Sequence, residues 1–336
     1  MPKTVHLSLT EGHALATACL KANGADEANA KAVADTMIAA EGDGCKSHGL
    51  FRLPGYVAAL RSGKVDGAAR PKVARIAPGV VRVDACGGYA PLALAAGRQP
   101  LIDAAREQGI AAMALVRSHH FAALWPEVEG LCEAGLAGLA CTAYMPAVAP
   151  AGARKAFFGT NPMSFGWPRR DGPPMVFDQA SATQAMGEVM IAARDGHELP
   201  PGVGLDAEGK PSTDPNEVLK GVLLPFGGYK GSAIAMMVEL LAAGLLGEHF
   251  SYEAAENDNK DGGPPAGGEF LLALDPSRFG DTGWMDHCEA FFERLLALEG
   301  TRLPGARRHK NRPAIAEKGF DLNAELHAKI LGLCGA

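Results

Sequence analysis

The spacing of apolar residues changes at residue 73, and this change constrains the fold more than any other feature. Before it, apolar side chains recur at helical intervals, and cap signals at Ser8 and Asp26 predict two helices between residues 8 and 42. A third helix is predicted to end at Ser62-Gly63. From Val73 the pattern alternates and becomes rich in β-branched residues, which is typical of strands. Because strands and helices then mix, we expect an α/β, layered α+β fold.

The same patterns suggest a division into two domains. Strands are predicted at 73–77, 80–84, 110–116, 137–143, 163–166, 175–177 and 269–274, and helices at 92–108, 126–134, 229–246, 284–299 and 322–333. Residues 178–228 are interpreted as an ordinary loop, and the polar, Gly/Pro-rich residues 252–268 as an exposed loop outside the core. We expect a helical domain of residues 1–72 with 284–336 and an α/β domain of residues 73–283.

Composition excludes several classes of function. The 336 residues carry a net charge of −6, which argues against broad binding to nucleic acid or anionic membranes. The N-terminus lacks a signal peptide and the most apolar stretch is too short to span a bilayer, so we expect a cytoplasmic protein with no membrane partner. Seven scattered cysteines, never in a C-x-x-C pair, indicate neither a disulfide framework nor a zinc site, and we predict no metal.

One short stretch concentrates the groups that catalysis needs. Ser47, His48 and Arg52 place a hydroxyl, an imidazole and a guanidinium within six residues. A histidine near its free pKa exchanges protons at neutral pH, and a planar arginine can hold a carboxylate through two hydrogen bonds. A Ser-His pair alone is common by chance, so the stretch is a candidate site that other features must support.

Missing motifs narrow the chemistry. The chain has no G-x-G-x-x-G after a strand, no phosphate-binding P-loop and no G-x-S-x-G nucleophile elbow. The usual dinucleotide-binding fingerprint is therefore absent, and a Ser-His-acid hydrolase becomes a distant alternative.

Four other stretches are unusual, and each has two interpretations. Arg117–Phe121 (RSHHF) ends a predicted strand, where α/β sheets bind ligands; its two adjacent histidines have the chemistry of metal ligands, but they would point in different directions on a strand or on a helix. Gly159–Pro162 (GTNP) has turn chemistry, and Phe226–Gly231 (FGGYKG) is a plain helix start or a phosphate site. The basic loop at 302–312 is either a solvated run or a site for a phosphate ester such as the 2′-phosphate of NADP.

Taken together, these motifs resemble the malate/L-lactate dehydrogenase type 2 family of nicotinamide oxidoreductases, which lack the Rossmann fingerprint. The matching segments are SHGLFRLPGY (47–56), RSHHF (117–121), VAPAGA (148–153), FGTNPMSFGWP (158–168), FGGYKGSAIAMMVELLAAGL (226–245) and RLPGARRHKNR (302–312). HFAALWPEVE (120–129) and LPPGVGLDAEGKPSTDP (199–215) are most similar to the Δ1-piperideine-2-carboxylate/Δ1-pyrroline-2-carboxylate reductase branch.

The resemblance implies a fold, an assembly and a set of site residues. The fold would combine a helical domain from both chain ends with a central NADPH-binding domain on a largely antiparallel or mixed sheet, and the protein would be a homodimer with sites near the interface. Catalysis would use Ser47, His48 and Glu188, and substrate binding would use Arg52, Thr160, Met186 and Gly187. Cofactor binding would use His120, Phe121, Ala122, Ala123, Leu124, Asp178, Gln179, Ala180, Tyr229, Gly305, Ala306, Arg307, Arg308, His309, Lys310 and Asn311.

One position departs from the family pattern. The family usually has Asp where this chain has Glu188, and the extra methylene moves the carboxylate by about one bond length. The relay that orients His48 is therefore the part of the resemblance most in need of a structural test.

The activity implied is NADPH-dependent reduction of cyclic ketimines, with NADH as a weaker cofactor. Δ1-Piperideine-2-carboxylate would give L-pipecolate and Δ1-pyrroline-2-carboxylate would give L-proline, in lysine and proline metabolism, with His48 as the proton donor. The alternative on the same fold is reduction of a 2-oxo acid to a 2-hydroxy acid.

Overall fold

The computed structural model describes residues 3–121, 123–280 and 282–335. A seven-stranded sheet in the order β2-β3-β4-β11-β5-β6-β7 forms the centre, and only the β3–β4 pair is parallel. Its strands are β2 (Lys72–Ala77), β3 (Val80–Asp84), β4 (Ile110–His119), β5 (Ala137–Thr142), β6 (Met163–Trp167), β7 (Met175–Gln179) and β11 (Ala266–Leu274). The expectation of a layered α/β fold with a largely antiparallel sheet is confirmed.

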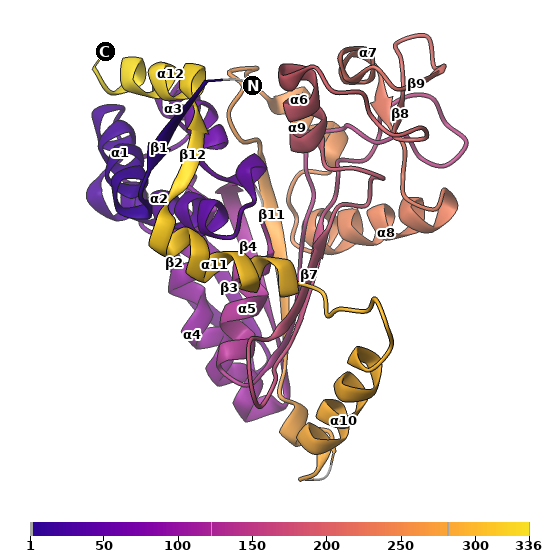
Figure 1. Ribbon diagram of the computed structural model, residues 1–336. Helices are drawn as coiled ribbons and strands as arrows, with labels where there is room; N and C mark the ends of the chain where they lie inside the picture. Colours follow the sequence, from indigo (N-terminus) through magenta and orange to yellow (C-terminus); the bar gives the residue numbers. More distant parts are fainter. Residues whose placement is uncertain (1–2, 122, 281, 336) are drawn as a thin grey trace.

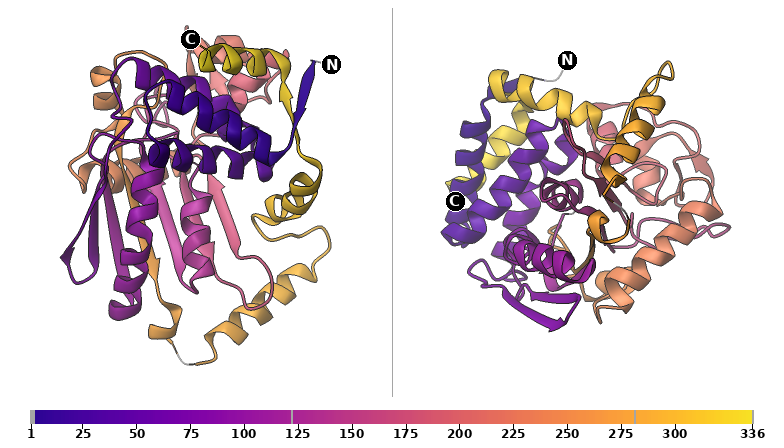
Figure 2. Two further views of the ribbon diagram at one scale, coloured as in Figure 1. Left: turned by 90° about the vertical axis from the view of Figure 1, so that its left-hand side faces the viewer. Right: turned by 90° about the horizontal axis from the view of Figure 1, so that it is seen from below.

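Helices cover both faces of this sheet. α4 (Ala90–Gln108) and α5 (Trp125–Glu133) lie along the strands on one face, as the left view of Figure 2 shows. On the other face, α8 (Tyr229–Glu239) continues into a π-helical turn, η3 (Leu240–Gly244), which contacts β11 and β5. The predicted helix 229–246 is therefore not regular throughout. Leu115 and Leu271 are among the core residues buried beneath α4 and α5.

The two ends of the chain meet in a helical layer. Strand β1 (Thr4–Leu7) pairs with β12 (Phe320–Asn323), and the two lie side by side in Figure 1. Helices α1 (Leu9–Ala22), α2 (Glu27–Gly42), α3 (Leu53–Arg61) and α12 (Ala324–Cys334) complete this layer. The predicted helix 322–333 was thus wrong at its start, because Phe320–Asn323 pairs with Thr4–Leu7 at the other end of the chain, and no local pattern shows this pairing.

Residues 178–228, predicted as a loop, form a small lobe instead. It contains α6 (Met186–Asp195), α7 (Pro215–Lys220) and the short strands β8 (Gly204–Leu205), β9 (Pro211–Ser212) and β10 (Val222–Leu223). Its own core includes Val189, Val203 and Leu223. The elements are too short to produce a clear periodicity, which explains why the pattern did not predict them.

Two further predictions about loops were wrong. Within residues 252–268, helix α9 (Ser251–Asn257) begins where Glu253 accepts a hydrogen bond from the Phe250 backbone N–H, and β11 already starts at Ala266. The basic segment at 302–312 is mostly helix α11 (Ala306–Lys318), which starts after Gly305 in the left-handed conformation (φ 81°). Its high charge and the internal Pro313 hide the helical pattern in the sequence.

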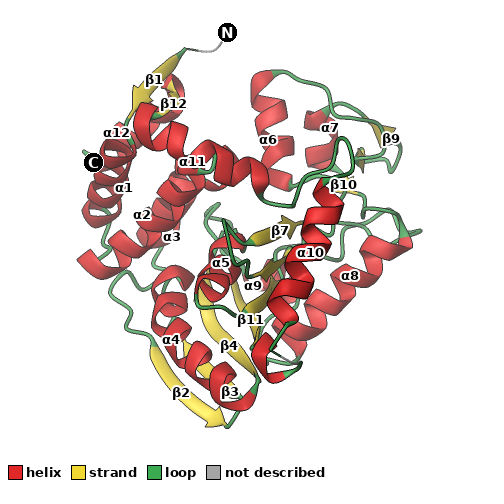
Figure 3. Cartoon of the chain, turned by 60° about the horizontal axis from the view of Figure 1, so that its bottom comes forward, coloured by secondary structure: helices red, strands yellow, loops and turns green. Residues whose placement is uncertain are grey.

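Helix α10 (Trp284–Leu296) lies apart from the other C-terminal elements, at the bottom of the molecule in Figure 1 and therefore in front in the view of Figure 3. Although the sequence analysis groups it with the helical ends, Glu289 pairs with Arg169 just after β6, and the Arg169 guanidinium lies 5.0 Å from the Phe292 ring. The domain boundaries at 72/73 and 283/284 stay a prediction. No helix in the described residues is long and apolar enough to cross a bilayer.

Candidate active site

The Ser47-His48 turn is shaped by the buried end of α2. Glu41 accepts a hydrogen bond from the Leu50 backbone N–H at 2.8 Å, and its carboxylate fills the space that a Cβ atom on Gly49 would need. Burial raises the pKa of Glu41 to about 7. Position 49 therefore has no room for a side chain, which explains the glycine. The turn places Ser47 and His48 on the short helix η1 (Lys46–His48), which is followed by η2 (Leu50–Arg52).

Ser47 and His48 form the predicted pair. Ser47 Oγ lies 3.1 Å from His48 Nδ1, and the imidazole meets the Trp125 ring edge-on with 6.1 Å between centroids. When the Ser47 hydroxyl donates to Nδ1, the imidazole proton lies on Nε2, the nitrogen on the other side of the ring. Ser47 thus contacts Nδ1 and Trp125 packs against the ring. This orientation suits proton transfer at Nε2.

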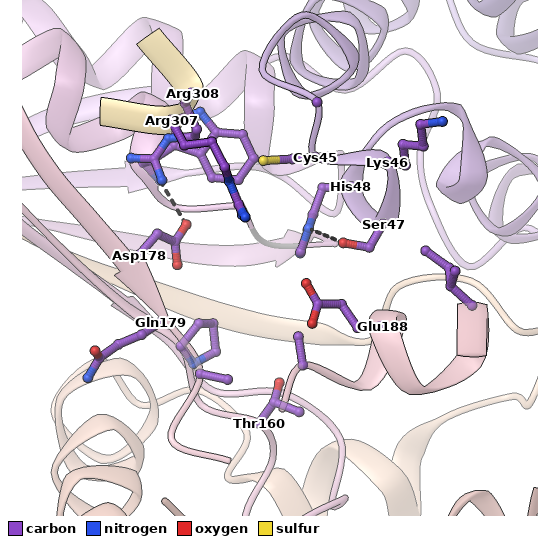
Figure 4. A pocket seen from close by; sticks show the side chains of 16 residues that line it. Cys45, Lys46, Ser47, His48, Thr160, Asp178, Gln179, Glu188, Arg307 and Arg308 are labelled. Atoms are coloured by element: carbon purple, nitrogen blue, oxygen red, sulfur yellow. Dashed lines mark hydrogen bonds between the residues drawn. The ribbon is translucent and has the colours of Figure 1, made fainter. Parts of the chain in front are cut away.

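Two cavities adjoin at His48. The larger, of about 460 Å³, is shown in Figure 4 and reaches from Ser47 and Glu188 to the basic helix α11. The smaller, of about 270 Å³, lies on the side of Arg52. Four residues line both cavities: His48, Thr160, Pro162 and Ala185. An imidazole between two adjoining cavities can serve a reaction between two bound molecules.

The smaller cavity contains a buried, oriented cation. Arg52 Nε donates to the Ser47 carbonyl at 2.7 Å, and the Arg52 guanidinium lies 5.0 Å from the Phe121 ring centroid. Burial lowers the pKa of Arg52, while the group remains a cation at neutral pH. Beside it, the first turn of α6 brings Met186 and Gly187 to the cavity wall.

The larger cavity is acidic in one wall and basic in another. Asp178 accepts hydrogen bonds from the backbone N–H groups of Leu124 and Trp125, at 2.8 and 3.0 Å, and so caps the start of α5. Burial raises the pKa of Asp178 to about 6, although these hydrogen bonds oppose the rise. Arg307 and Arg308 form the basic wall.

The basic wall has a free donor for an anion. Arg308 donates from Nη2 to the Val176 carbonyl at 2.9 Å and stacks over Trp125 at 5.2 Å, but its buried Nε has no partner among the described residues. Arg307 is exposed at the same wall. A buried N–H without an acceptor is costly unless a ligand completes it. These two arginines therefore fit a phosphate group of a bound nucleotide.

Glu188 lies in the first turn of α6 and lines the larger cavity together with Ser47 and His48. In Figure 4 its carboxylate is turned toward these two side chains. The helix thus places an acid beside the pair even though the chain has Glu where the family usually has Asp.

Several residues expected at the cofactor do not line the larger cavity. Phe121 lines the smaller cavity instead, and Tyr229 is 71% exposed at the start of α8. His120 is buried with both ring nitrogens unpaired among the described residues, and burial lowers its pKa to about 4. The others that line neither cavity are Ala123, Leu124, Gly305, Ala306, His309, Lys310 and Asn311. Ala122 lies outside the described residues.

The end of the basic segment is occupied by contacts within the protein. His309 Nε2 lies 3.2 Å from the Pro174 carbonyl, and Asn311 donates to the Asp43 carbonyl. Arg312 pairs with both Asp43 and Glu129, so this guanidinium holds α11 against α2 and α5. Only the first turn of α11 is thus left to face the cavity.

The structure adds site residues that the sequence analysis missed. Trp125 packs against His48 and Arg308, and Tyr144, Met145, Pro146 and Ala147 form one wall of the smaller cavity. The segment 144–147 follows the end of a predicted strand, which was the only signal for it in the sequence. Among the described residues, no cluster of three or more His, Cys, Asp or Glu could hold a metal ion.

The fold of the described residues lacks a Rossmann domain, and the site has two adjoining cavities with His48 between them, which is the arrangement of an enzyme that binds two molecules at once. Comparison with known proteins gives the family. The sequence model of the malate/L-lactate dehydrogenase family matches residues 7–331, so the chain belongs to this family. It is 46% identical over 332 residues to a Delta(1)-pyrroline-2-carboxylate/Delta(1)-piperideine-2-carboxylate reductase of Pseudomonas aeruginosa, covering 98% of this chain and 99% of the relative.

Two further relatives have different activities in their names. The crystal structure of delta1-piperideine-2-carboxylate reductase from Pseudomonas syringae superposes with a TM-score of 0.92 at 42% identity, covering 98% of this chain and 100% of that one. A (2R)-3-sulfolactate dehydrogenase (NADP(+)) of Chromohalobacter salexigens is 44% identical over 303 residues, 90% of each chain. Because an imine reductase and a hydroxy-acid dehydrogenase have similar identities, the cavity itself must separate these activities.

Proposed function

We propose that the protein reduces the cyclic ketimines Δ1-piperideine-2-carboxylate and Δ1-pyrroline-2-carboxylate to L-pipecolate and L-proline, with NADPH as the cofactor. The observation that carries this proposal is the lining of the smaller cavity. Among the described residues that line it, Arg52 is the one permanent cation, and the wall beside it includes Phe121, Tyr144 and residues 145–147. One carboxylate with an apolar ring fits this lining.

An open-chain diacid fits it less well. A 2-oxo acid with a second anionic group, such as oxaloacetate or 3-sulfopyruvate, would bring that group to the wall formed by Tyr144, Met145 and Pro146. Removing a second anion from water without a second cation to pair with it costs free energy. The cavity therefore favours the imine over these two acids, although a small monoacid such as pyruvate remains the alternative substrate.

The cofactor would occupy the larger cavity, between Trp125, Asp178 and Gln179, with its phosphates near Arg307 and Arg308. A nicotinamide cofactor supplies a hydride when bound. Reduction of a cyclic imine adds this hydride to C2 and a proton to the ring nitrogen, so the protein must provide the proton.

The residues of the chain have separate tasks in this scheme. Arg52 binds the substrate carboxylate through two hydrogen bonds and so fixes C2 beside His48. The imidazolium form of His48 gives its Nε2 proton to the imine nitrogen and becomes a neutral imidazole, whose Nδ1–H donates to Ser47 Oγ. Glu188 stabilises the protonated imidazole from the α6 side of the cavity. Ser47 has no nucleophilic part in this reaction.

The test is a parallel assay of cofactor oxidation with NADPH and NADH. The substrates are piperideine-2-carboxylate, pyrroline-2-carboxylate, pyruvate and oxaloacetate. We expect both imines to be reduced with the highest kcat/KM and NADPH to be preferred over NADH. Fast turnover of pyruvate without turnover of either imine would replace the proposal with the 2-hydroxy acid dehydrogenase alternative.

The role of His48 and the assembly need their own tests. The His48→Ala variant should lose activity between about pH 6 and 9, while its binding of NADPH, measured by fluorescence, is retained. Imine reduction at the wild-type rate would show that His48 is not the proton donor. We also propose a homodimer, which light scattering of the purified protein would test.

A further inference from the structure

The wall of the smaller cavity contains a tyrosine, Tyr144, that the reaction scheme above does not use. Tyr144 follows β5 and lines the cavity with Arg52 and Thr160, and its side chain is half-buried. In the part of the chain that the structure describes, no acceptor or donor bonds the Tyr144 hydroxyl. By contrast, the Tyr89 hydroxyl donates to the Tyr56 carbonyl at 2.6 Å.

The backbone at Tyr144 is fixed by the turn that follows Phe158. The Tyr144 N–H donates to Asn161 Oδ1 at 3.3 Å, and the fully buried Asn161 also donates to Glu239 Oε1 at 2.8 Å. Gly159 lies so close to the Tyr144 carbonyl that no side chain fits there. Gly159 and Asn161 thus hold the Tyr144 segment, while Thr160 between them lines both cavities.

Tyr144 and Arg52 share a third residue that positions both. The Phe121 ring centroid lies 6.5 Å from the Tyr144 ring and 5.0 Å from the Arg52 guanidinium. Burial raises the pKa of Tyr144 to about 12 and the Arg52 charge opposes this rise, so the hydroxyl is protonated and electrostatically coupled to the guanidinium. A neutral donor and a cation therefore face one small cavity.

We propose that Tyr144 is a further substrate-contacting residue, whose hydroxyl donates a hydrogen bond to the carboxylate that Arg52 binds. Its ring, packed beside Phe121, then lies against the methylene groups of the substrate ring. The contact between the Tyr144 ring and a substrate ring rests on the proposed function. The hydrogen bond to the carboxylate does not, because imino acids and 2-oxo acids both carry this group.

The experiment compares Tyr144→Phe with the wild-type enzyme. The variant keeps the aromatic ring and removes only the hydroxyl, and Tyr252→Phe is the matched control because Tyr252 is exposed and lines neither cavity. Binding of pyrrole-2-carboxylate, a planar ring acid that cannot be reduced, is measured in the presence of NADP⁺, alongside its neutral carboxamide. KM and kcat for the imines, the Kd for NADPH and the Tm are measured in parallel.

We expect Tyr144→Phe to raise the Kd for pyrrole-2-carboxylate and the KM for the imines about tenfold, the size of a hydrogen bond to a charged group. The Kd values for the carboxamide and for NADPH should change less than about twofold, and the Tm should change by less than a few degrees. An unchanged Kd for pyrrole-2-carboxylate would overturn the inference, and so would an equal loss for the carboxylate and the carboxamide.

The result can be separated from a failure of the proposed function. If the wild-type enzyme reduces pyruvate and neither imine, the proposed function fails. The Tyr144 inference is then decided by the Kd for pyrrole-2-carboxylate and the KM for pyruvate, since both molecules carry the carboxylate.

Discussion

Gly187 lies against the Arg52 guanidinium with no room for a side chain: a Cβ atom there would be 2.8 Å from Arg52 Nη2 and 3.0 Å from Ser47 Cβ. Gly187→Ala should therefore displace the carboxylate-binding group. We expect KM for the substrate to rise at least about tenfold, because misplacement by a fraction of an ångström weakens a bidentate contact. Steady-state kinetics with a saturating cofactor would measure this.

The matched control for Gly187→Ala is Gly332→Ala. Gly332 is also in a helix, α12, but open space surrounds its Cβ position. This control should keep wild-type kinetics and gain slightly in Tm. Equal KM values for the Gly187→Ala variant and the wild type would show that Arg52 does not hold the substrate from this side.

The two arginines in the first turn of α11 should set the cofactor preference. Arg307→Ala removes an exposed cation from the wall of the larger cavity, so KM for NADPH should rise about tenfold, while KM for NADH should stay nearly constant. Lys318→Ala, an exposed cation in the last turn of the same helix, is the control. An equal rise for both cofactors would place Arg307 near a phosphate that they share.

Glu188 should act through His48. Glu188→Gln keeps the size of the side chain and removes the charge, so the imidazolium loses its stabilising partner and the pKa that governs kcat should fall. The kcat should drop by about tenfold or more, with little change in KM. A pH profile of kcat tests this, and Glu188→Asp, which retains the charge, should restore most of the activity. Identical pH profiles for Glu188→Gln and the wild type would exclude the relay.

Short-range chemistry made part of this site predictable. Ser47, His48 and Arg52 come within six residues, so their proximity follows from the chain itself, and the structure joins them by hydrogen bonds. The resemblance supplied Glu188, and the structure places it in the same cavity on α6. That helix was not predicted, because a ten-residue segment between turns gives little periodic signal.

The remainder depends on contacts between distant segments. Tyr144 lies in no motif, and Trp125 lies in the segment HFAALWPEVE without a role that its sequence indicates; only the fold brings them to the two cavities beside His48. The pairing of β1 with β12 is equally invisible to local patterns. Conversely, Arg312 belongs to the basic segment that the sequence suggested as a phosphate site. In the structure its guanidinium is paired with Asp43, at the end of α2, and with Glu129 on α5.

Those partners make Arg312 a determinant of stability. Its guanidinium bonds to Asp43 and Glu129, both largely buried, so Arg312→Met should leave two carboxylates without a counter-charge. Because the arginine is partly exposed, we expect a loss of about 2 kcal/mol rather than the full cost of breaking a buried pair. Urea unfolding measures this, with Arg302→Met as the exposed control. Equal midpoints for the two variants would contradict the prediction.

Buried acids beneath the site should make the stability depend on pH. Glu127 on α5 is buried with one carboxylate oxygen unpaired among the described residues, and burial, reinforced by Asp178, raises its pKa to about 8 while Arg98 opposes the rise. Between the ordinary pKa of glutamate, about 4.5, and about 8, the unfolded chain therefore binds fewer protons than the folded one, and the free energy of unfolding falls as the pH rises.

Glu127→Gln should reduce this dependence, and the buried Glu269 beside it, whose pKa burial also raises, should retain the rest. The Tm difference between the variant and the wild type should be several degrees more positive at about pH 9 than at about pH 5. The reason is that the amide has no charge to bury at high pH. Calorimetry across this range measures the difference, and Glu133→Gln, an exposed residue on the same helix, should run parallel to the wild type. If Glu127→Gln also runs parallel to the wild type, the pKa of Glu127 is not raised in the folded protein and the prediction is wrong.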